Sequence, residues 1–182
     1  VELAEYRKKR RLSLHAKVVL QFSVIFWVGG AVLLALLEWS NPRTMGGLSV
    51  PSKLMAALFQ SVSTRTAGMN TIDLAACSPI SKLLMSVLQF IGAAPGSTGG
   101  GVKVTTFAVL ILTIRSVAQG RDDCVIGGHH IESKTVYRAL TIIVLGAVAA
   151  FGSAVVVYYN TAETVSVIDC IFESCSAFGT VG

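Results

Sequence analysis

Residues 92–103 read GAAPGSTGGGVK, and a glycine-rich segment that ends in lysine can do two kinds of chemistry. Its backbone N–H groups can cradle phosphates, or it can break a helix and expose backbone carbonyls. Gly96 and Gly101 have the spacing of a nucleotide-binding loop, but Val102 occupies the position that such a loop gives to lysine. Both flanking segments are strongly apolar, which disfavours a nucleotide-binding domain, and we keep that function only as an alternative.

A short pattern that occurs twice indicates a second candidate site. FQSVS at 59–63 is followed by TRTAG, which ends at Gly68, and FESCS at 172–176 is followed by AFGTVG, which ends at Gly182. Because glycine has no side chain, it adopts backbone angles that can turn its carbonyl toward a neighbouring path. A ring of such carbonyls can replace the water shell of a monovalent cation. The two glycine loops therefore predict an ion-selectivity filter.

The elements that must hold these segments are those of an all-α membrane protein. The chain of 182 residues is 53% hydrophobic and 14% charged, with a mean hydropathy of +0.68, whereas soluble domains carry about 25% charged residues. Residues 18–37 and 137–159 are long enough to cross a bilayer, which takes about 20 apolar residues. Residues 52–62 and 165–178 are too short to cross, and we predict that they form re-entrant or interfacial helices. Residues 80–117 are too long for one span and are interrupted by the glycine-rich segment.

In both copies a spanning helix precedes a short helix and a re-entrant glycine loop, which is the span–pore helix–span order of a potassium-channel-like pore unit. We predict a basic cytoplasmic segment at 1–17, one pore unit at 18–117, a cytoplasmic loop at 118–136 and a partial pore unit at 137–182. Basic residues precede the first span and occupy the loop before the last span, and the positive-inside rule places both segments in the cytoplasm.

Three motifs together resemble a known family. SVSTRTAGMNTID at 61–73, GSTGGGVK at 96–103 and SAFGTVG at 176–182 are similar to segments of the Trk/Ktr/HKT potassium transporter superfamily, with most similarity to its KtrB-type membrane subunit. In that family four pore units surround one pore, and this chain resembles the third and fourth units, without the first two and without the last helix. The resemblance implies that the filter consists of Thr66, Ala67, Gly68, Thr180, Val181 and Gly182.

The resemblance also implies that the glycine-rich segment is an intramembrane loop that gates the pore below the filter. The gate residues would be Gly92, Pro95, Gly96, Ser97, Thr98, Gly99, Gly100, Gly101 and Lys103. Each glycine destabilises a continuous helix by about 1 kcal/mol and the proline by about 3 kcal/mol, so a broken helix fits this composition. The alternative is a close helix crossing that needs small residues.

The predicted function is potassium uptake across the cell membrane by the pore-forming subunit of a Ktr/Trk-type transporter, and not an enzyme activity. The alternatives are a membrane scaffold that does not transport, or an enzyme subunit that binds a nucleotide at residues 92–103. The resemblance implies K⁺ as the transported ion, Na⁺ as a coupling ion and no covalent cofactor. No aromatic residue interleaves the basic residues of the N-terminal segment, so we predict no nucleic-acid binding.

The resemblance further implies a multi-pass homodimer in the lipid bilayer of a bacterial inner (plasma) membrane. In the family this dimer rests on a cytoplasmic ring of nucleotide-binding regulatory subunits of the KtrA/TrkA-like RCK type. Residues 115–138 form the only sizeable cytoplasmic loop that we predict and are the candidate docking surface. The alternative is a loop that only sets the membrane topology.

Two charged residues, Arg65 and Glu173, lie near the predicted filter. Arg65 either steers cations away from wrong routes, pairs with Glu173, or reaches the outer interface. Lys103 either lines the pore or reaches toward the cytoplasm. His129 and His130 match no zinc spacing, so we predict no metal site.

Overall fold

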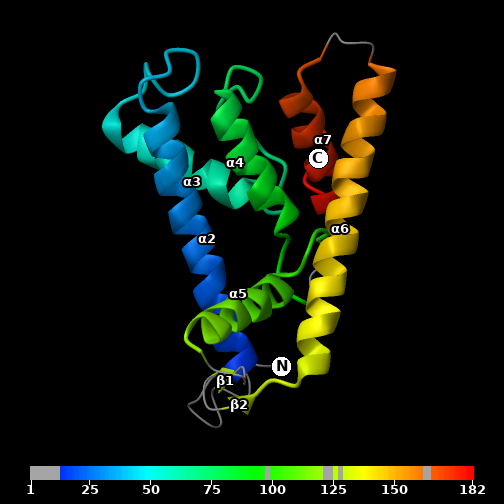
Figure 1. The fold of residues 1–182 in the computed structure, drawn as a ribbon. Helices are drawn as coiled ribbons and strands as arrows, with labels where there is room; N and C mark the ends of the chain where they lie inside the picture. The colour runs from blue at the N-terminus through cyan, green and yellow to red at the C-terminus, as the bar shows by residue number, and fades with distance from the viewer. Residues whose placement is uncertain (1–12, 97–98, 121–124, 127–128, 162–164) are drawn as a thin grey trace.

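The computed structural model describes residues 13–96, 99–120, 125–126, 129–161 and 165–182. In these residues the chain forms, in order, α2 (Leu14–Glu38), α3 (Val50–Ser63), α4 (Pro79–Phe90), α5 (Val104–Ala118), β1 (Val125–Ile126), β2 (His129–His130), α6 (Ser133–Asn160) and α7 (Val167–Gly179). The long helices α2 and α6 stand apart, α4 and α7 lie between them in one half of the molecule, and α5 runs across the other half (Figure 1).

Two helices, α2 and α6, are long and apolar enough to cross a membrane, over His15–Glu38 and Ser133–Asn160. At about 1.5 Å per residue, helices of this length exceed the hydrocarbon layer of about 30 Å. Large apolar side chains on both helices are exposed, including Leu36 at 72% and Val155 at 67%, which suits surfaces that face lipid.

The loop predicted at 118–136 is shorter than expected and is not purely irregular. Helix α6 begins at Ser133 and not at 137. Strands β1 and β2 form an antiparallel hairpin, in which Val125 pairs with His130, so the fold departs from the all-helical prediction by this one short element among the described residues. The hairpin and the first turns of α2 and α6 lie at the same end of the molecule (Figure 1). The basic residues at 1–12 lie outside the described residues.

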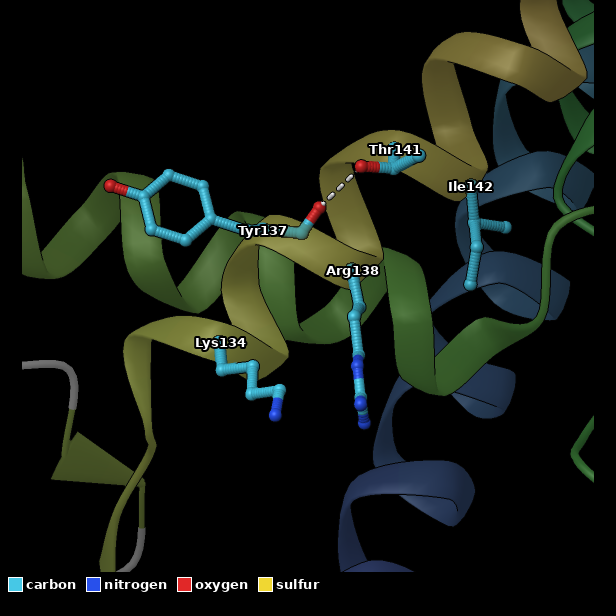
Figure 2. A pocket seen from close by; sticks show the side chains of 5 residues that line it. All are labelled: Lys134, Tyr137, Arg138, Thr141 and Ile142. Atoms are coloured by element: carbon cyan, nitrogen blue, oxygen red, sulfur yellow. Dashed lines mark hydrogen bonds between the residues drawn. The ribbon is translucent and has the colours of Figure 1, made fainter.

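The first turns of α6 border a groove of about 650 Å³. Lys134 and Arg138, one helical turn apart, point in the same direction, while Ile142 lies one turn further along the helix (Figure 2). Tyr137 lies beside them, and its side chain is 69% exposed. This end of α6 is therefore a basic surface bordered by aromatic and apolar groups.

The short helices α3 and α7 each begin after a serine with extended backbone, Ser49 and Ser166. Helix α3 crosses α2 closely because Gly30 has no side chain: a Cβ atom there would lie 2.9 Å from Leu88 Cδ1 and would also overlap Ser61. The buried Ser61 hydroxyl donates to the Trp27 carbonyl at 2.8 Å, so this polar crossing is satisfied.

The apolar segment 80–117 forms two helices. Helix α4 ends at Phe90 and α5 begins at Val104, and the glycine-rich segment connects them. Helix α5 does not continue the axis of α4 but turns across the molecule (Figure 1). With 15 residues, about 22 Å at the helical rise, α5 is too short to span the hydrocarbon layer.

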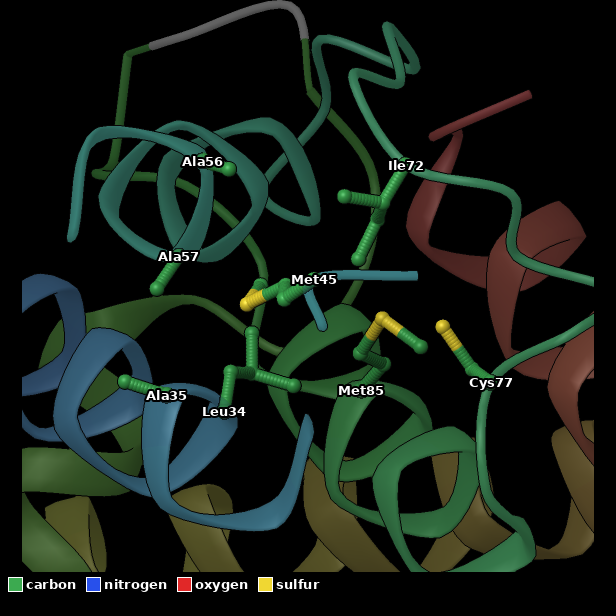
Figure 3. Packing of buried hydrophobic residues seen from close by; sticks show 8 residues of the cluster. All are labelled: Leu34, Ala35, Met45, Ala56, Ala57, Ile72, Cys77 and Met85. Atoms are coloured by element: carbon green, nitrogen blue, oxygen red, sulfur yellow. The ribbon is translucent and has the colours of Figure 1, made fainter. Parts of the chain in front are cut away.

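A buried apolar cluster fixes α3 against α2 and α4 (Figure 3). Its members are Leu34, Ala35, Met45, Ala56, Ala57, Ile72, Cys77 and Met85. Phe172 of α7 packs against the same cluster and joins the second half of the chain to it. Burial raises the pKa of the Cys77 thiol to about 12, so Cys77 stays neutral near pH 7 and packs as an apolar residue.

Candidate functional site

The two predicted filter segments follow the ends of α3 and α7 and share one backbone pattern. The φ angle is 76° at Thr66 and 71° at Gly68, and it is 53° at Thr180 and 94° at Gly182. Threonine is β-branched, and a φ in the left-handed region costs such a residue about 1–3 kcal/mol. The two threonines are the only non-glycine residues with positive φ in the described part of the chain. Strain of this kind concentrates at functional sites.

The two segments meet each other. A Cβ atom on Gly68 would overlap the Val181 carbonyl oxygen, so the backbone of the first segment lies directly against the second. A small cavity of about 10 Å³, about the volume that one water molecule needs, is lined by Gly68, Val181 and Gly182. The fold therefore brings together two segments that are more than 100 residues apart in the sequence.

A serine in the last turns of each short helix ties down the segment that follows. The Ser63 hydroxyl donates to the Met69 carbonyl, and the Ser176 hydroxyl donates to the Gly182 carbonyl at 3.4 Å. Each serine also uses its own carbonyl: Ser63 accepts from the amide of Ala67 at 3.1 Å, and Ser176 accepts from the amide of Val181 at 2.9 Å. These serines belong to the repeated pattern, but their role was not foreseen from the sequence.

The glycine-rich segment is a loop whose two ends are joined. The Gly92 amide donates to the Val102 carbonyl at 2.9 Å, and the Val102 amide donates to the Phe90 carbonyl at 2.9 Å. Pro95 and Gly96 at the other end of the loop are exposed. Ser97 and Thr98, which we predicted to belong to the gate, lie outside the described residues.

The far arm of this loop packs against both predicted filter segments. A Cβ atom on Gly99 would lie 2.6 Å from Thr66 Cγ2, and one on Gly100 would lie 2.7 Å from Thr180 Cγ2. The Gly100 amide donates to Thr180 Oγ1 at 2.6 Å, and the Gly101 amide donates to the Phe178 carbonyl at 3.0 Å. The glycines are therefore needed for close approach, as the packing alternative requires, and they approach both predicted filter segments and the last turn of α7 at the Phe178 carbonyl.

The same bonds bear on the nucleotide alternative. A phosphate cradle needs free backbone N–H groups. Those of Gly92, Gly100 and Gly101 all donate to acceptors within the protein. In this conformation the loop cannot present them to a phosphate.

The contacts of the charged residues near the predicted filter contradict three of our hypotheses. Arg65 does not pair with Glu173: its Nη2 donates to the Gly92 carbonyl at 2.8 Å, and Glu173 is exposed on α7. Arg65 also does not reach the outer interface, because its side chain is only 9% exposed. Lys103 folds back within the loop and donates to the Gly99 carbonyl. It therefore does not extend toward the cytoplasm.

Sequence analysis did not single out Glu38, which lies at the end of α2. The Glu38 carboxylate is fully buried and accepts four hydrogen bonds, from Asn41 Nδ2 at 2.6 Å, Thr44 Oγ1 at 2.6 Å, the Ser78 amide at 2.8 Å and Ser81 Oγ at 2.5 Å. These bonds join the end of α2 to the start of α4. No sequence signal distinguishes this acid from one at a membrane interface, because its partners lie up to 43 positions away.

An ion pair of 2.6 Å between Lys82 Nζ of α4 and Asp169 Oδ1 of α7 joins the two halves. It is the only salt bridge in the described part of the chain. The described residues also contain no group of three or more His, Cys, Asp or Glu side chains that could hold a metal ion. Residues 121–124, which include two aspartates and a cysteine, lie outside them.

Comparison with known proteins identifies the family of this chain. The family model described as "TrkH: Cation transport protein" matches residues 4–182. The chain belongs to the TrkH family of cation transport proteins. The resemblance expected from the three motifs is thereby confirmed.

Two relatives are similar to this TrkH-family chain. The potassium uptake protein B of the Ktr system from Vibrio alginolyticus is 39% identical over 171 residues, which cover 94% of this chain and 37% of that protein. The protein of the same name from Bacillus subtilis (strain 168) is 32% identical over 181 residues, which cover 100% of this chain and 40% of that protein. The chain thus spans less than half the length of these relatives, both of which are named as transporters and not as enzymes.

The fold also has a solved counterpart. The crystal structure of the potassium transporter TrkH from Vibrio parahaemolyticus matches with a TM-score of 0.67 at 21% sequence identity, over 89% of this chain and 36% of that one. At this identity the match supports a shared fold. The family match and the two long apolar helices support the interpretation of the chain as a membrane protein.

Proposed function

We propose that this chain forms part of a potassium-selective pore in a Ktr/Trk-type uptake system. One observation carries the proposal: two short helices end in segments with the same left-handed threonine and glycine, and these segments meet above a single glycine-rich loop. The strained backbone at Thr66 and Thr180 destabilises the fold, so it supports a functional role for these two segments.

In the proposed mechanism, α3 and α7 act as pore helices, and residues 66–68 and 180–182 as filter segments. The carboxyl end of each helix carries a partial negative charge of about half an elementary charge, which favours a cation in front of it. Backbone carbonyls of the segments replace part of the water shell of K⁺. The strain at each threonine is offset by hydrogen bonds from Ser63 and Ser176 to the following carbonyls.

In the same proposal, residues 92–103 are the gate. The loop contacts both filter segments from the side on which α5 crosses the molecule, so it stands in the way of an ion that leaves the filter. Non-helical backbone at membrane depth lasts only where it is buried in protein or lines an aqueous path. Both conditions fit a loop that is packed when closed and hydrated when open.

The complete transporter is proposed from the family resemblance. It would be a multi-pass homodimer in a bacterial plasma membrane that moves K⁺, with Na⁺ as a coupling ion. A cytoplasmic ring of nucleotide-binding subunits would dock at the end that carries the hairpin and the start of α6. The groove beside Lys134 and Arg138 supports this, because two cations one helical turn apart provide a basic surface for an acidic partner.

Uptake measurements test the proposal directly. The protein is expressed from its complete gene in bacterial cells that lack their own potassium uptake systems. We expect growth at low external K⁺ and uptake of K⁺ in preference to Na⁺. Correct insertion into the membrane without any K⁺ uptake, with the regulatory subunits of the same system present, would contradict the proposal and favour a scaffold.

A further inference from the structure

Arg65 occupies an unusual position for a charged residue. It immediately precedes the first predicted filter segment, and its side chain is 9% exposed. The guanidinium carbon lies 5.5 Å from the centre of the Phe26 ring on α2. The salt bridge of the described residues joins Lys82 to Asp169, so no carboxylate among those residues neutralises Arg65.

The hydrogen bonds of Arg65 are incomplete. Nη2 donates to the Gly92 carbonyl at 2.8 Å, but Nε and Nη1 are buried and have no acceptor among the described residues. A buried charge at membrane depth is costly unless it is paired or hydrated, and unsatisfied buried donors add to that cost. Packing alone would favour an apolar side chain at this position. The arginine therefore calls for a function of the charge or of its donors.

The acceptor that Arg65 does bind indicates this function. Gly92 is the point where the two ends of the glycine-rich loop meet, because its amide donates to Val102. Phe26, which covers the guanidinium, also packs against Phe107 of α5, with ring centres 5.7 Å apart. Arg65 thus contacts the start of the loop directly and the helix after the loop through one aromatic ring.

We infer that Arg65 is a positioning residue that latches the loop at 92–103 closed against the filter. This rests on the proposed function of the loop as a gate. The bond to the Gly92 carbonyl holds the loop only in the closed position. When the loop moves away, water that enters from the pore satisfies the donors of Arg65, so that the open position is not prohibitively costly. A charged donor makes the latch stronger than a neutral hydrogen bond would be.

The latch is tested with a cysteine placed in the loop as Ala94→Cys and labelled by a water-soluble thiol reagent from the cytoplasmic side. Labelling of the protein without this cysteine gives the background from the native thiols. We expect Arg65→Met to label roughly ten- to a hundredfold faster, since a hydrogen bond from a charged donor shifts an equilibrium by about that factor. Arg65→Lys keeps a charged donor and should restore most of the slow labelling. The ratio of K⁺ to Na⁺ uptake should stay unchanged in both variants.

A matched control removes another cation. Lys82→Met also deletes a positive charge, but Lys82 contacts Asp169 and not the loop. It should leave the labelling rate of the introduced cysteine unchanged. Equal acceleration by Lys82→Met would overturn the latch, as would unchanged labelling in Arg65→Met. A fall of the K⁺ to Na⁺ ratio without faster labelling would also overturn it, because Arg65 would then act on the filter.

If Arg65→Met is not inserted into the membrane, a comparison of Arg65→Lys with Arg65→Gln tests the latch instead. Arg65→Lys should then label at a rate close to that of the protein with Arg65. In a separate variant, Arg65→Gln keeps a neutral donor and should label faster than Arg65→Lys, because its bond to the Gly92 carbonyl lacks the charge. Equal labelling rates in these two variants would overturn the latch.

The latch and the proposed pore function can each fail without the other. If Gly68→Ser changes ion selectivity while the Arg65 variants leave the labelling rate unchanged, the proposed pore function is supported and the proposed latch is rejected. If the protein does not transport K⁺ at all, the labelling still reports whether Arg65 holds the loop.

Discussion

The predicted filter segment after α3 and the one after α7 have the same backbone pattern but different supports. The first is linked to the loop at 92–103 by the Arg65 side chain, which donates to the Gly92 carbonyl. The second is linked to the same loop by the Thr180 hydroxyl and by the Phe178 carbonyl, which accept from the amides of Gly100 and Gly101. One loop therefore binds both halves of the molecule, by a charged side chain at its start and by neutral groups at its end.

The segments also differ in the space around their glycines. A side chain on Gly68 would overlap the Val181 carbonyl, whereas no atom lies within 4 Å of a Cβ placed on Gly182 among the described residues. The shared φ pattern follows from the repeated sequence, but contacts with the rest of the protein decide how each segment is held.

The largest effect is expected from Gly68→Ser. A side chain there meets a positive φ and the Val181 carbonyl together, and the ratio of K⁺ to Na⁺ uptake should fall by about tenfold or more, which corresponds to about 1.4 kcal/mol. Gly182→Ser meets only the unfavourable φ, and its effect should be smaller. Gly29→Ser, at a site with open space, is the control and should leave the ratio unchanged. An equal fall of the K⁺ to Na⁺ ratio in Gly68→Ser and Gly182→Ser would contradict the idea that the steric difference between the segments matters for selectivity.

Deletion of residues 94–99 should have the next largest effect. It removes the contact of Gly99 with Thr66 and shortens the loop that supports both segments. We expect a several-fold increase in K⁺ flux, measured in reconstituted vesicles, because an obstruction below the filter is gone. An unchanged flux through correctly inserted protein would favour the packing role of the glycines over the gate.

The smallest effect is expected from Thr180→Val, which keeps the shape of the side chain but removes the acceptor for the Gly100 amide. A neutral hydrogen bond contributes about 1 kcal/mol, so the labelling rate of a cysteine introduced by Ala94→Cys should rise about fivefold. Thr180→Ser keeps the hydroxyl and should label at the original rate. An increase as large as that of Arg65→Met would show that charge does not distinguish the two supports.

Much of the framework was predictable because it depends on local properties of the chain. The predicted spans 18–37 and 137–159 lie within α2 and α6, since length and apolar composition are sufficient to identify helices of this kind. The interruption between α4 and α5 follows from glycine and proline, which destabilise a helix wherever they occur in its interior. Strands β1 and β2 and the start of α6 at Ser133 were not predicted, because short strands and helix ends have weak local signals.

The partners of the buried charges were not predictable from the sequence. Arg65 binds a carbonyl 27 positions away, and Glu38 binds a serine 43 positions away. The sequence suggested the carboxylate of Glu173 as a partner for Arg65, because opposite charges are the partners that sequence inspection can propose. The structure uses a backbone carbonyl instead, and every residue carries one.

The sequence by itself determined the family, the two long apolar helices and the position of the two glycine loops, because hydrophobic length and the lack of a side chain at glycine act at the level of single segments. Only the tertiary structure decided that residues 66–68 and 180–182 meet, that Gly99 and Gly100 touch the two segments, and that Arg65 donates to Gly92. These are contacts between segments far apart in the chain. They depend on how α5 turns across the molecule and on which glycines allow close approach, and neither is encoded in any one stretch of residues.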